Sequence, residues 1–479
     1  MVYVADGTND SPTTLSRMAR ATEAGKSLLR RPLLVVCLLL LVAGCSEDPH
    51  RAPVEASPED TPTSEARPLR ERPAGPARDT TTSGVMEGAV YGYTYGLASG
   101  NRVVRGEGRL PEAKPVDVDL SGGTPVWIAG VPLENDTAWA VTYNDGRVDT
   151  FRLDGGSGEV VPWLTAPDHL PGGAPPLLVA DEGRLGLVTL KGVSPLTHPV
   201  RTDGGLLGVA PDGWLVSGAG ENPPISALPD ARIVEAENGS LAVLSDPTSR
   251  YIHGVLGDAL EAGSIGVLEA GRGGYDVNAR VRAESGGVFE TLAPLWFSPA
   301  QGDEQLLAIT ETTEREGSRI SVYSPGGNLV AAGPFVGEPQ SWRHLVAAGP
   351  FGPKGEVEIA AVRTPHASGP VEFYRLDRGN GELRIVASGG EYLSHTIYSR
   401  NLDAARAGDL DGDGSWELLL PDASYTALEA VRRTEGGVET AWRVPLGGTL
   451  ATNLASATDS EGRVALAAGT AEGKLRIWR

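Results

Sequence analysis

The feature that most constrains this fold is a turn motif that recurs along the second half of the chain. The segment AGDLDGDGSWELLL begins at residue 407 and AGPFGPKGEVEIAA begins at residue 348, so the two lie 59 residues apart (407 − 348). Weaker copies are FSPAQGDEQLLAI at 297–309 and ATDSEGRVALAAG at 457–469. One turn followed by an apolar run, repeated at near-equal intervals, predicts a fold built from copies of one strand-and-turn unit.

The region that carries these repeats, residues 86–479, predicts strands and turns throughout. Short apolar runs such as GRVDTFRLD (146–154) and RISVYSP (319–325) alternate with turn residues, and the chain contains 63 glycines and 36 prolines. No long segment has helical periodicity. We therefore expect an all-β domain, a β-propeller with seven blades of four strands.

Other blade numbers and other all-β folds stay open at this point. The first half of the domain shows the repeat poorly, so six or eight blades are alternatives to seven. A β-helix has much shorter repeats, and a pair of β-sandwiches would not place one turn at near-equal intervals. For ring closure, we expect the first strand, near residues 88–96, to pair with the last blade, which ends in GKLRIWR.

The N-terminal region predicts export rather than a domain. Residues 30–45, RRPLLVVCLLLLVAGC, join two arginines to an apolar run. That run is shorter than the roughly 20 residues that span a bilayer, and it matches the apolar part of a signal peptide. A buried helix or an ordinary signal peptide is the alternative. The residues before the arginines are many for a signal peptide, which makes Met18 a candidate start.

The ending VAGC resembles the lipobox of bacterial lipoproteins. This resemblance implies that residues 1–44 are removed as a signal peptide and that Cys45 carries lipid. Residues 45–85 are rich in proline and polar residues and cannot bury enough apolar surface to fold. They predict a disordered tether. The chain is then expected in the bacterial cell envelope, lipid-anchored and facing outside the cytoplasm.

The acidic turn at 407–420 predicts a cation site. Asp409, Asp411 and Asp413 occupy alternate positions, and Gly414 permits the sharp bend that follows. Carboxylates converging in a tight loop provide the oxygen ligands that calcium prefers. An EF-hand would need a glutamate where Leu420 stands, so that interpretation fails. A hydrated Asp-Gly turn is the alternative to a metal site.

This D-x-D-G-D-G-x-x-E arrangement resembles the FG-GAP or VCBS-type repeat of integrin-like propellers. The resemblance covers one strong copy and about three degenerate ones, and it implies one structural Ca²⁺. The implied ligands are Asp409, Asp411, Asp413, the Ser415 carbonyl and Glu417. In the copy at 348–361 the aspartates are lost, and Lys354 is expected to replace the cation. Trp416 lies within the turn, whereas most other tryptophans are expected in blade cores.

The sequence favours a binding module over an enzyme. The formal net charge of −21 argues against a nucleic-acid partner, because phosphate binding needs a basic surface. Beyond residue 45 the chain has no cysteine, and none of the common catalytic motifs occurs. His395 is expected to be structural rather than part of a pocket.

We therefore expect a non-enzymatic envelope lipoprotein that binds a protein or a glycan, or that serves as a scaffold. The alternatives are an accessory subunit of an envelope assembly machine and a calcium-dependent propeller enzyme that acts on polysaccharide.

Overall fold

The computed structural model describes residues 90–95, 97–103, 106–163, 170, 173–181, 184–218, 222–272 and 274–479. All of them belong to the compact unit that runs from Ala74 to Arg479. The predicted signal peptide (1–44), Cys45 and the tether (45–85) lie outside the described residues. Within the described part of the chain, no helix could span a membrane.

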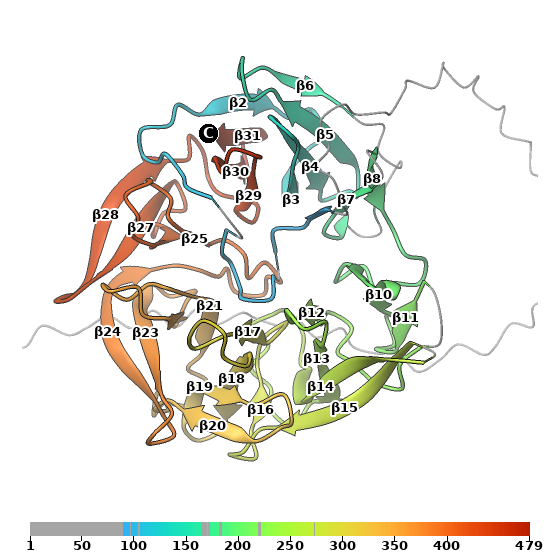
Figure 1. Ribbon diagram of the computed structural model, residues 1–479, viewed down its shortest axis with the longest axis vertical. Helices are drawn as coiled ribbons and strands as arrows, with labels where there is room; N and C mark the ends of the chain where they lie inside the picture. The colour runs from blue at the N-terminus through green and yellow to red at the C-terminus, as the bar shows by residue number, and fades with distance from the viewer. Residues whose placement is uncertain are drawn as a thin grey trace, which may run out of the picture. The chain divides into compact units, whose positions relative to one another are not determined.

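The described residues form antiparallel sheets arranged around a central axis (Figure 1). Six groups of four strands are complete, three of them linked within one 13-stranded sheet through β16 (Val288–Phe289) and the β20–β24 pairing. The first group is β3 (Pro125–Pro132), β4 (Thr137–Tyr143), β5 (Val148–Leu153) and β6 (Val160–Pro162). The second is β12 (Val234–Glu235), β13 (Leu241–Thr248), β14 (Glu261–Gly271) and β15 (Gly274–Arg282). The third is β17 (Leu295–Phe297), β18 (Leu306–Thr313), β19 (Gly317–Tyr323) and β20 (Leu329–Ala332).

The remaining groups complete the ring. The fourth is β21 (Arg343–Gly349), β22 (Glu358–Arg363), β23 (Gly369–Asp377) and β24 (Glu382–Tyr392). The fifth is β25 (Arg406–Gly408), β26 (Glu417–Pro421), β27 (Ala427–Thr434) and β28 (Gly437–Pro445). The sixth is β29 (Ala455–Thr458), β30 (Val464–Thr470), β31 (Lys474–Trp478) and β2 (Val116–Asp119). Two further sheets have three strands each. One contains β1 (Val90–Gly92), β7 (Leu177–Asp181) and β8 (Arg184–Val188), and the other contains β9 (Val200–Thr202), β10 (Gly205–Val209) and β11 (Leu215–Ser217). Apart from β1, their strands lie between β6 and β12 in sequence.

This ring of antiparallel sheets is a β-propeller, and the predicted fold class is confirmed. The count of seven blades stays a prediction, because it depends on whether the two three-stranded sheets are one blade or two. Neighbouring sheets bury their faces against each other, so middle strands such as β4, β22 and β30 are buried along almost their whole length. Trp139, Trp296 and Trp478 lie in these cores, as expected, whereas Trp214 is 53% exposed.

The repeated turn occupies the same place in four consecutive blades. Each copy joins the first and second strands: β17–β18, β21–β22, β25–β26 and β29–β30. The two strongest copies also share one register, since Gly408 pairs with Glu417 and Gly349 pairs with Glu358. The alignment of residues 407–420 on residues 348–361 is therefore confirmed.

Ring closure differs from the expectation. The strand that pairs with β31 is β2, with Val118 opposite Leu475, whereas β1 pairs with β7. The expected pairing of residues 88–96 with the last blade is wrong. After β1 the chain first follows the inner strands of three blades: Trp296 N of β17 donates to Ala98 O (2.6 Å), Asn101 N donates to Val346 O of β21 (2.9 Å), and Val103 N donates to Ala407 O of β25 (2.8 Å). Only then does it reach the outer edge of the last blade.

The two ends of the blades carry different connections. Neighbouring strands in a four-stranded blade run in opposite directions. The turn between the first and second strands and the turn between the third and fourth strands therefore lie at the same end of the blade. The turn between the second and third strands and the link to the next blade lie at the other end. We call the end that carries the repeated turn the lower face and the opposite end the upper face. Val90 pairs with Ala180, near the lower end of β7, so the described chain enters on the lower face.

Candidate functional site

The upper face carries exposed apolar side chains on two loops, residues 249–260 and 393–405, which we call the two-loop surface. Ile252 and Tyr398 are both 68% exposed, Ile397 is 45% exposed and Leu260 is 38% exposed. Isolated exposed apolar residues are ordinary, but several on adjoining loops mark an interaction site. No single stretch of sequence contains both loops, and sequence analysis missed them.

The two loops are held together by hydrogen bonds and ion pairs. Tyr398 N donates to Val255 O at 2.7 Å. Arg400 donates from Nε to Asp230 (2.9 Å) and from Nη2 to Asp258 (2.5 Å), which ties both loops to the segment before β12. Tyr398 has a φ of 67°, which is unusual for a residue other than glycine. The loops thus hold an exposed aromatic ring in a strained conformation.

A cavity of about 540 Å³ opens beside the two-loop surface. Its walls come from strand β3 and from upper-face loops of several blades, and they include Trp127, Leu196, Arg400, Asn401 and Tyr425. An apolar cavity with a few polar groups is the usual form of a binding site. The upper face therefore combines an apolar surface with an adjoining cavity.

Below the two-loop surface lies a cluster of buried titratable side chains. Burial, with Glu290, Asp258 and Asp230 nearby, raises the pKa of Glu261 to about 10. His253 Nδ1 lies 2.5 Å from Glu290 Oε1. Perturbed carboxyls are frequent in active sites, but Glu261 is 3% exposed and Glu290 is 0% exposed. A substrate does not reach groups buried to this degree, and we regard the cluster as support for the loops.

His395 belongs to the same support. It is 1% exposed, its Nε2 lies 2.8 Å from Ser399 O, and its ring meets Trp342 edge-on at 5.0 Å. Burial lowers its pKa to about 4, so the ring is neutral at pH 7. The expectation of a structural His395 agrees with these contacts.

The acidic turn lies on the lower face. Carboxylate oxygens of Asp409, Asp411 and Asp413 lie within 4.8 Å of one another, and Asp409 accepts hydrogen bonds from Gly412 N (2.8 Å) and Gly414 N (3.0 Å). These hydrogen bonds aim the carboxylates into the bend. Three convergent carboxylates have the donor chemistry of a calcium site.

A guanidinium group already occupies the centre of this turn. Arg432 Nη2 lies 2.8 Å from Asp411, 2.9 Å from Asp413 and 2.6 Å from Glu417. Glu417 is fully buried and its second oxygen accepts from Leu410 N at 3.1 Å. Burial raises the pKa of Glu417 to about 7. The aspartates fit a calcium ion, but a cation that also used Glu417 would displace Arg432.

The copy at 348–361 has the same arrangement without aspartates. Arg375 contacts Glu356 (3.2 Å) and Glu358 (2.5 Å), and Glu358 aligns with Glu417. The side chains paired with these glutamates are therefore Arg375 on β23 and, at Glu358, also Arg433 on β27 (3.2 Å), rather than Lys354 of the turn. Trp416 packs edge-on against Phe351 of the preceding blade, at 5.6 Å between ring centres. Its role here is packing between blades.

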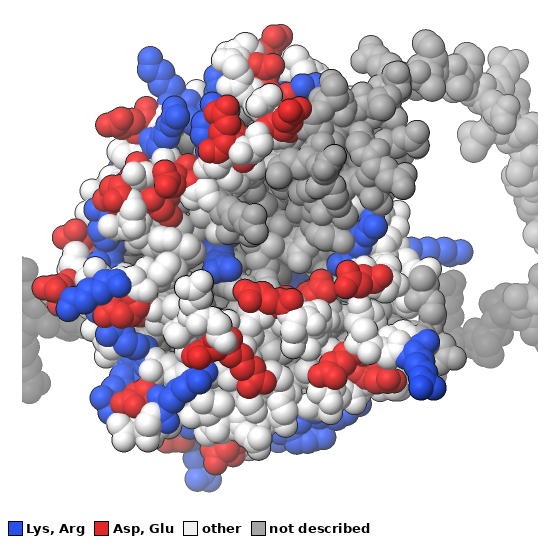
Figure 2. Space-filling model, viewed as in Figure 1, with Lys and Arg blue, Asp and Glu red and all other residues white. Residues whose placement is uncertain are grey.

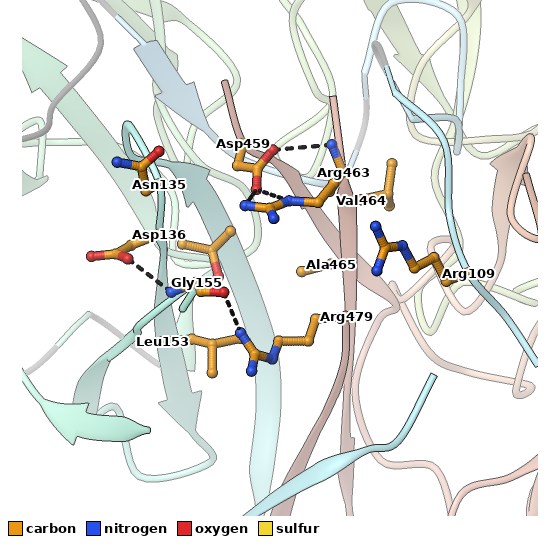
Figure 3. Close-up of a pocket in the computed structure, with 11 residues that line it drawn as sticks. Arg109, Asn135, Asp136, Leu153, Gly155, Asp459, Arg463, Val464, Ala465 and Arg479 are labelled. Atoms are coloured by element: carbon orange, nitrogen blue, oxygen red, sulfur yellow. Dashed lines mark hydrogen bonds and ion pairs between the residues drawn. The ribbon is translucent and has the colours of Figure 1, made fainter. Parts of the chain in front are cut away.

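A second lower-face site is a cavity of about 240 Å³ between the first and last blades. Arg109, Arg463 and Arg479 line it together with Asp136 and Asp459 (Figure 3). Figure 2 shows that acidic and basic side chains are otherwise interspersed over the visible face. Sequence analysis missed this cavity because its arginines are separated by hundreds of residues.

The arrangement of the described sheets defines a β-propeller, a fold that does not by itself assign a function. No protein-family model and no curated protein matches the chain. Among solved structures, it is similar to a chain of "Crystal Structure of Mitotic Checkpoint Complex" (12% identity, 79% of this chain and 98% of that chain, TM-score 0.38). It is also similar to "Structure of Dos1 propeller" (11% identity, 76% of this chain and 95% of that chain, TM-score 0.38). A third similar structure is Raptor of Chaetomium thermophilum (11% identity, 80% of this chain and 29% of that chain, TM-score 0.37). At such low TM-scores these likenesses carry no functional argument.

Proposed function

We propose that this chain is an envelope lipoprotein whose propeller binds a partner protein through the two-loop surface. The observation that carries the proposal is the exposure of Ile252, Ile397 and Tyr398 on adjoining, mutually hydrogen-bonded loops. Holding Tyr398 at a φ of 67° costs about 1 kcal/mol, and the contacts between the two loops offset that cost. A partner side chain would enter the adjoining cavity beside Arg400 and Tyr425.

Site-specific photo-crosslinking in the native cells tests this surface. A photoreactive residue at Tyr398 is expected to capture one partner, and Ile252→Ser with Ile397→Ser is expected to abolish the capture. The matched controls are photoreactive residues at Leu329 and Val161, which are exposed apolar positions on outer strands. Equal capture at the control positions would refute the proposal that the two-loop surface is the binding site. If the wild type binds a glycan and the same Ser variants lose that binding, the ligand of the two-loop surface is a glycan and not a protein.

The anchoring part of the proposal rests on the lipobox-like sequence that ends at Cys45. Val90 lies at the lower end of β7, so a tether before it would leave from the lower face. A lipid on Cys45 would then hold the propeller near the membrane through a flexible tether. Cys45→Ser is expected to move the chain from the membrane fraction to the soluble fraction. An unchanged membrane fraction would contradict lipid anchoring.

The calcium part of the proposal rests on the three convergent aspartates. One Ca²⁺ would bind Asp409, Asp411 and Asp413, with the Ser415 carbonyl and Glu417 as further ligands once Arg432 has moved. Its role would be structural, because carboxylates gathered in one turn repel each other until a cation neutralises them. Arg432 supplies part of that neutralisation without metal.

A further inference from the structure

The lower-face cavity between the first and last blades has an unusual charge arrangement. Its carboxylates are already paired: Asp136 with Arg152, and Asp459 with Arg463 at 2.8 Å. Arg463 also contacts Glu461 at 3.0 Å, so its charge is largely neutralised. Among the described residues, no carboxylate side chain pairs with Arg109 or Arg479. Two positive charges therefore remain at one cavity of a strongly acidic protein.

Arg479 is fixed in place while keeping free donors. Its Nη1 donates to Asp154 O (3.1 Å) and to Gly155 O (2.7 Å), and its remaining N–H groups have no partner among the described side chains. A guanidinium group that is held by carbonyls keeps its whole charge, because carbonyl groups are neutral. Its position is therefore set before any ligand binds.

Arg109 extends toward the same cavity from a separate segment. The backbone on either side of it is clamped by Gly108 N to Asp409 O (2.8 Å) and Leu110 N to Leu410 O (2.8 Å). In Figure 3, Ala465 lies between Arg109 on one side and Arg463 and Arg479 on the other. All four residues line the same cavity of about 240 Å³.

We propose that this cavity binds a phosphate group through Arg109 and Arg479. The planar donor fork of arginine matches phosphate oxygens, and two unpaired guanidinium groups balance a dianion. With a net charge of −21, the protein as a whole repels anions, so binding would depend on these local charges. The phosphate would belong either to a soluble ester or to a lipid headgroup.

The test is isothermal titration of the full-length chain with glycerol 3-phosphate, and co-sedimentation with phosphatidylglycerol or phosphatidylcholine vesicles. Arg109→Gln is expected to weaken binding about tenfold, the loss of one charge-assisted contact. Arg109 has no side-chain partner in the described chain, so this variant is expected to fold. The matched control is Arg378→Gln, since Arg378 is also an exposed lower-face arginine and has only a 3.5 Å pair with Asp303.

Each outcome either identifies the source of the phosphate group or overturns the proposed phosphate site. Arg109-dependent binding of glycerol 3-phosphate assigns a soluble ester. An Arg109 dependence found only with phosphatidylglycerol vesicles assigns a lipid headgroup. The proposal is overturned if Arg109→Gln changes neither binding, or if Arg378→Gln weakens binding equally. None of these results depends on the two-loop surface.

Discussion

Replacing Arg432 by Gln should increase the calcium affinity of the acidic turn. The guanidinium group of Arg432 touches Asp411, Asp413 and Glu417 within 2.9 Å, so calcium competes with it for the same oxygens. Arg432 is 22% exposed and Asp413 is 43% exposed, which screens part of this interaction. We take about 0.7 kcal/mol for each of the three contacts, or about 2 kcal/mol in all. Removing the competitor then strengthens calcium binding roughly thirtyfold.

The assay is calorimetric titration of full-length protein with calcium after treatment with EDTA. The wild-type chain is expected to bind weakly, with a Kd of about 0.1–1 mM. Arg432→Gln is expected to bind in the micromolar range, and Asp411→Asn in the Arg432→Gln background should abolish binding. Arg375→Gln is the matched control, because Arg375 holds the equivalent place in the preceding blade, whose turn lacks the aspartates.

Two results would refute this reasoning. If neither the wild type nor Arg432→Gln binds calcium, the turn is a hydrogen-bonded acidic loop held by Arg432. If both bind with equal affinity, calcium uses the aspartates without displacing the guanidinium group. A thermal melt with and without calcium gives a second readout, because a ligand of the native state raises the Tm.

Two further predictions concern stability. Glu261→Gln should flatten the pH dependence of stability: with a folded pKa of about 10, Glu261 binds a proton that the unfolded state releases above its ordinary pKa. The free energy of unfolding of the wild type should then fall by on the order of 1 kcal/mol per pH unit between about pH 5 and pH 10. Burial and the charges of Glu290, Asp258 and Asp230 oppose ionisation of Glu261. An equal change in the free energy of urea unfolding between pH 5 and pH 9 in both proteins would contradict this. Gly108→Ala should destabilise the chain by about 1–3 kcal/mol, because a Cβ at this position would lie 2.1 Å from Leu410 O. The control in the same thermal melt is Gly186→Ala, because a Cβ there would have no atom within 4 Å.

The blades of the second half could be predicted because their repeated turns contain residues that the turn itself requires. Gly414 and Gly355 both have positive φ, at 87° and 76°, and both precede a buried strand. Such local constraints are visible in one stretch of sequence. The first half lacks these turns, and its blades could not be recognised in the same way.

Contacts between distant segments could not be predicted. Arg432 lies opposite Glu417 in the β26–β27 register, and nothing in the turn itself indicates an arginine on the next strand. The closing strand β2 has the sequence VDVD with its aspartates exposed, so it resembles a polar loop. Ile252 and Tyr398 come together only because the ring brings their blades into one face.

The pairing of β2 with β31 also fixes when the domain can be completed during synthesis. Val116 lies opposite Ile477, so the strand made first among the six complete blades waits for a residue made 361 positions later (477 − 116). Until then the last blade lacks its outer strand, and β2 leaves its backbone donors and acceptors unpaired. Unpaired strand edges are the usual sites of aggregation in partly made proteins. The two exposed aspartates of VDVD keep this waiting strand charged, and charged side chains on a strand edge disfavour pairing with other chains.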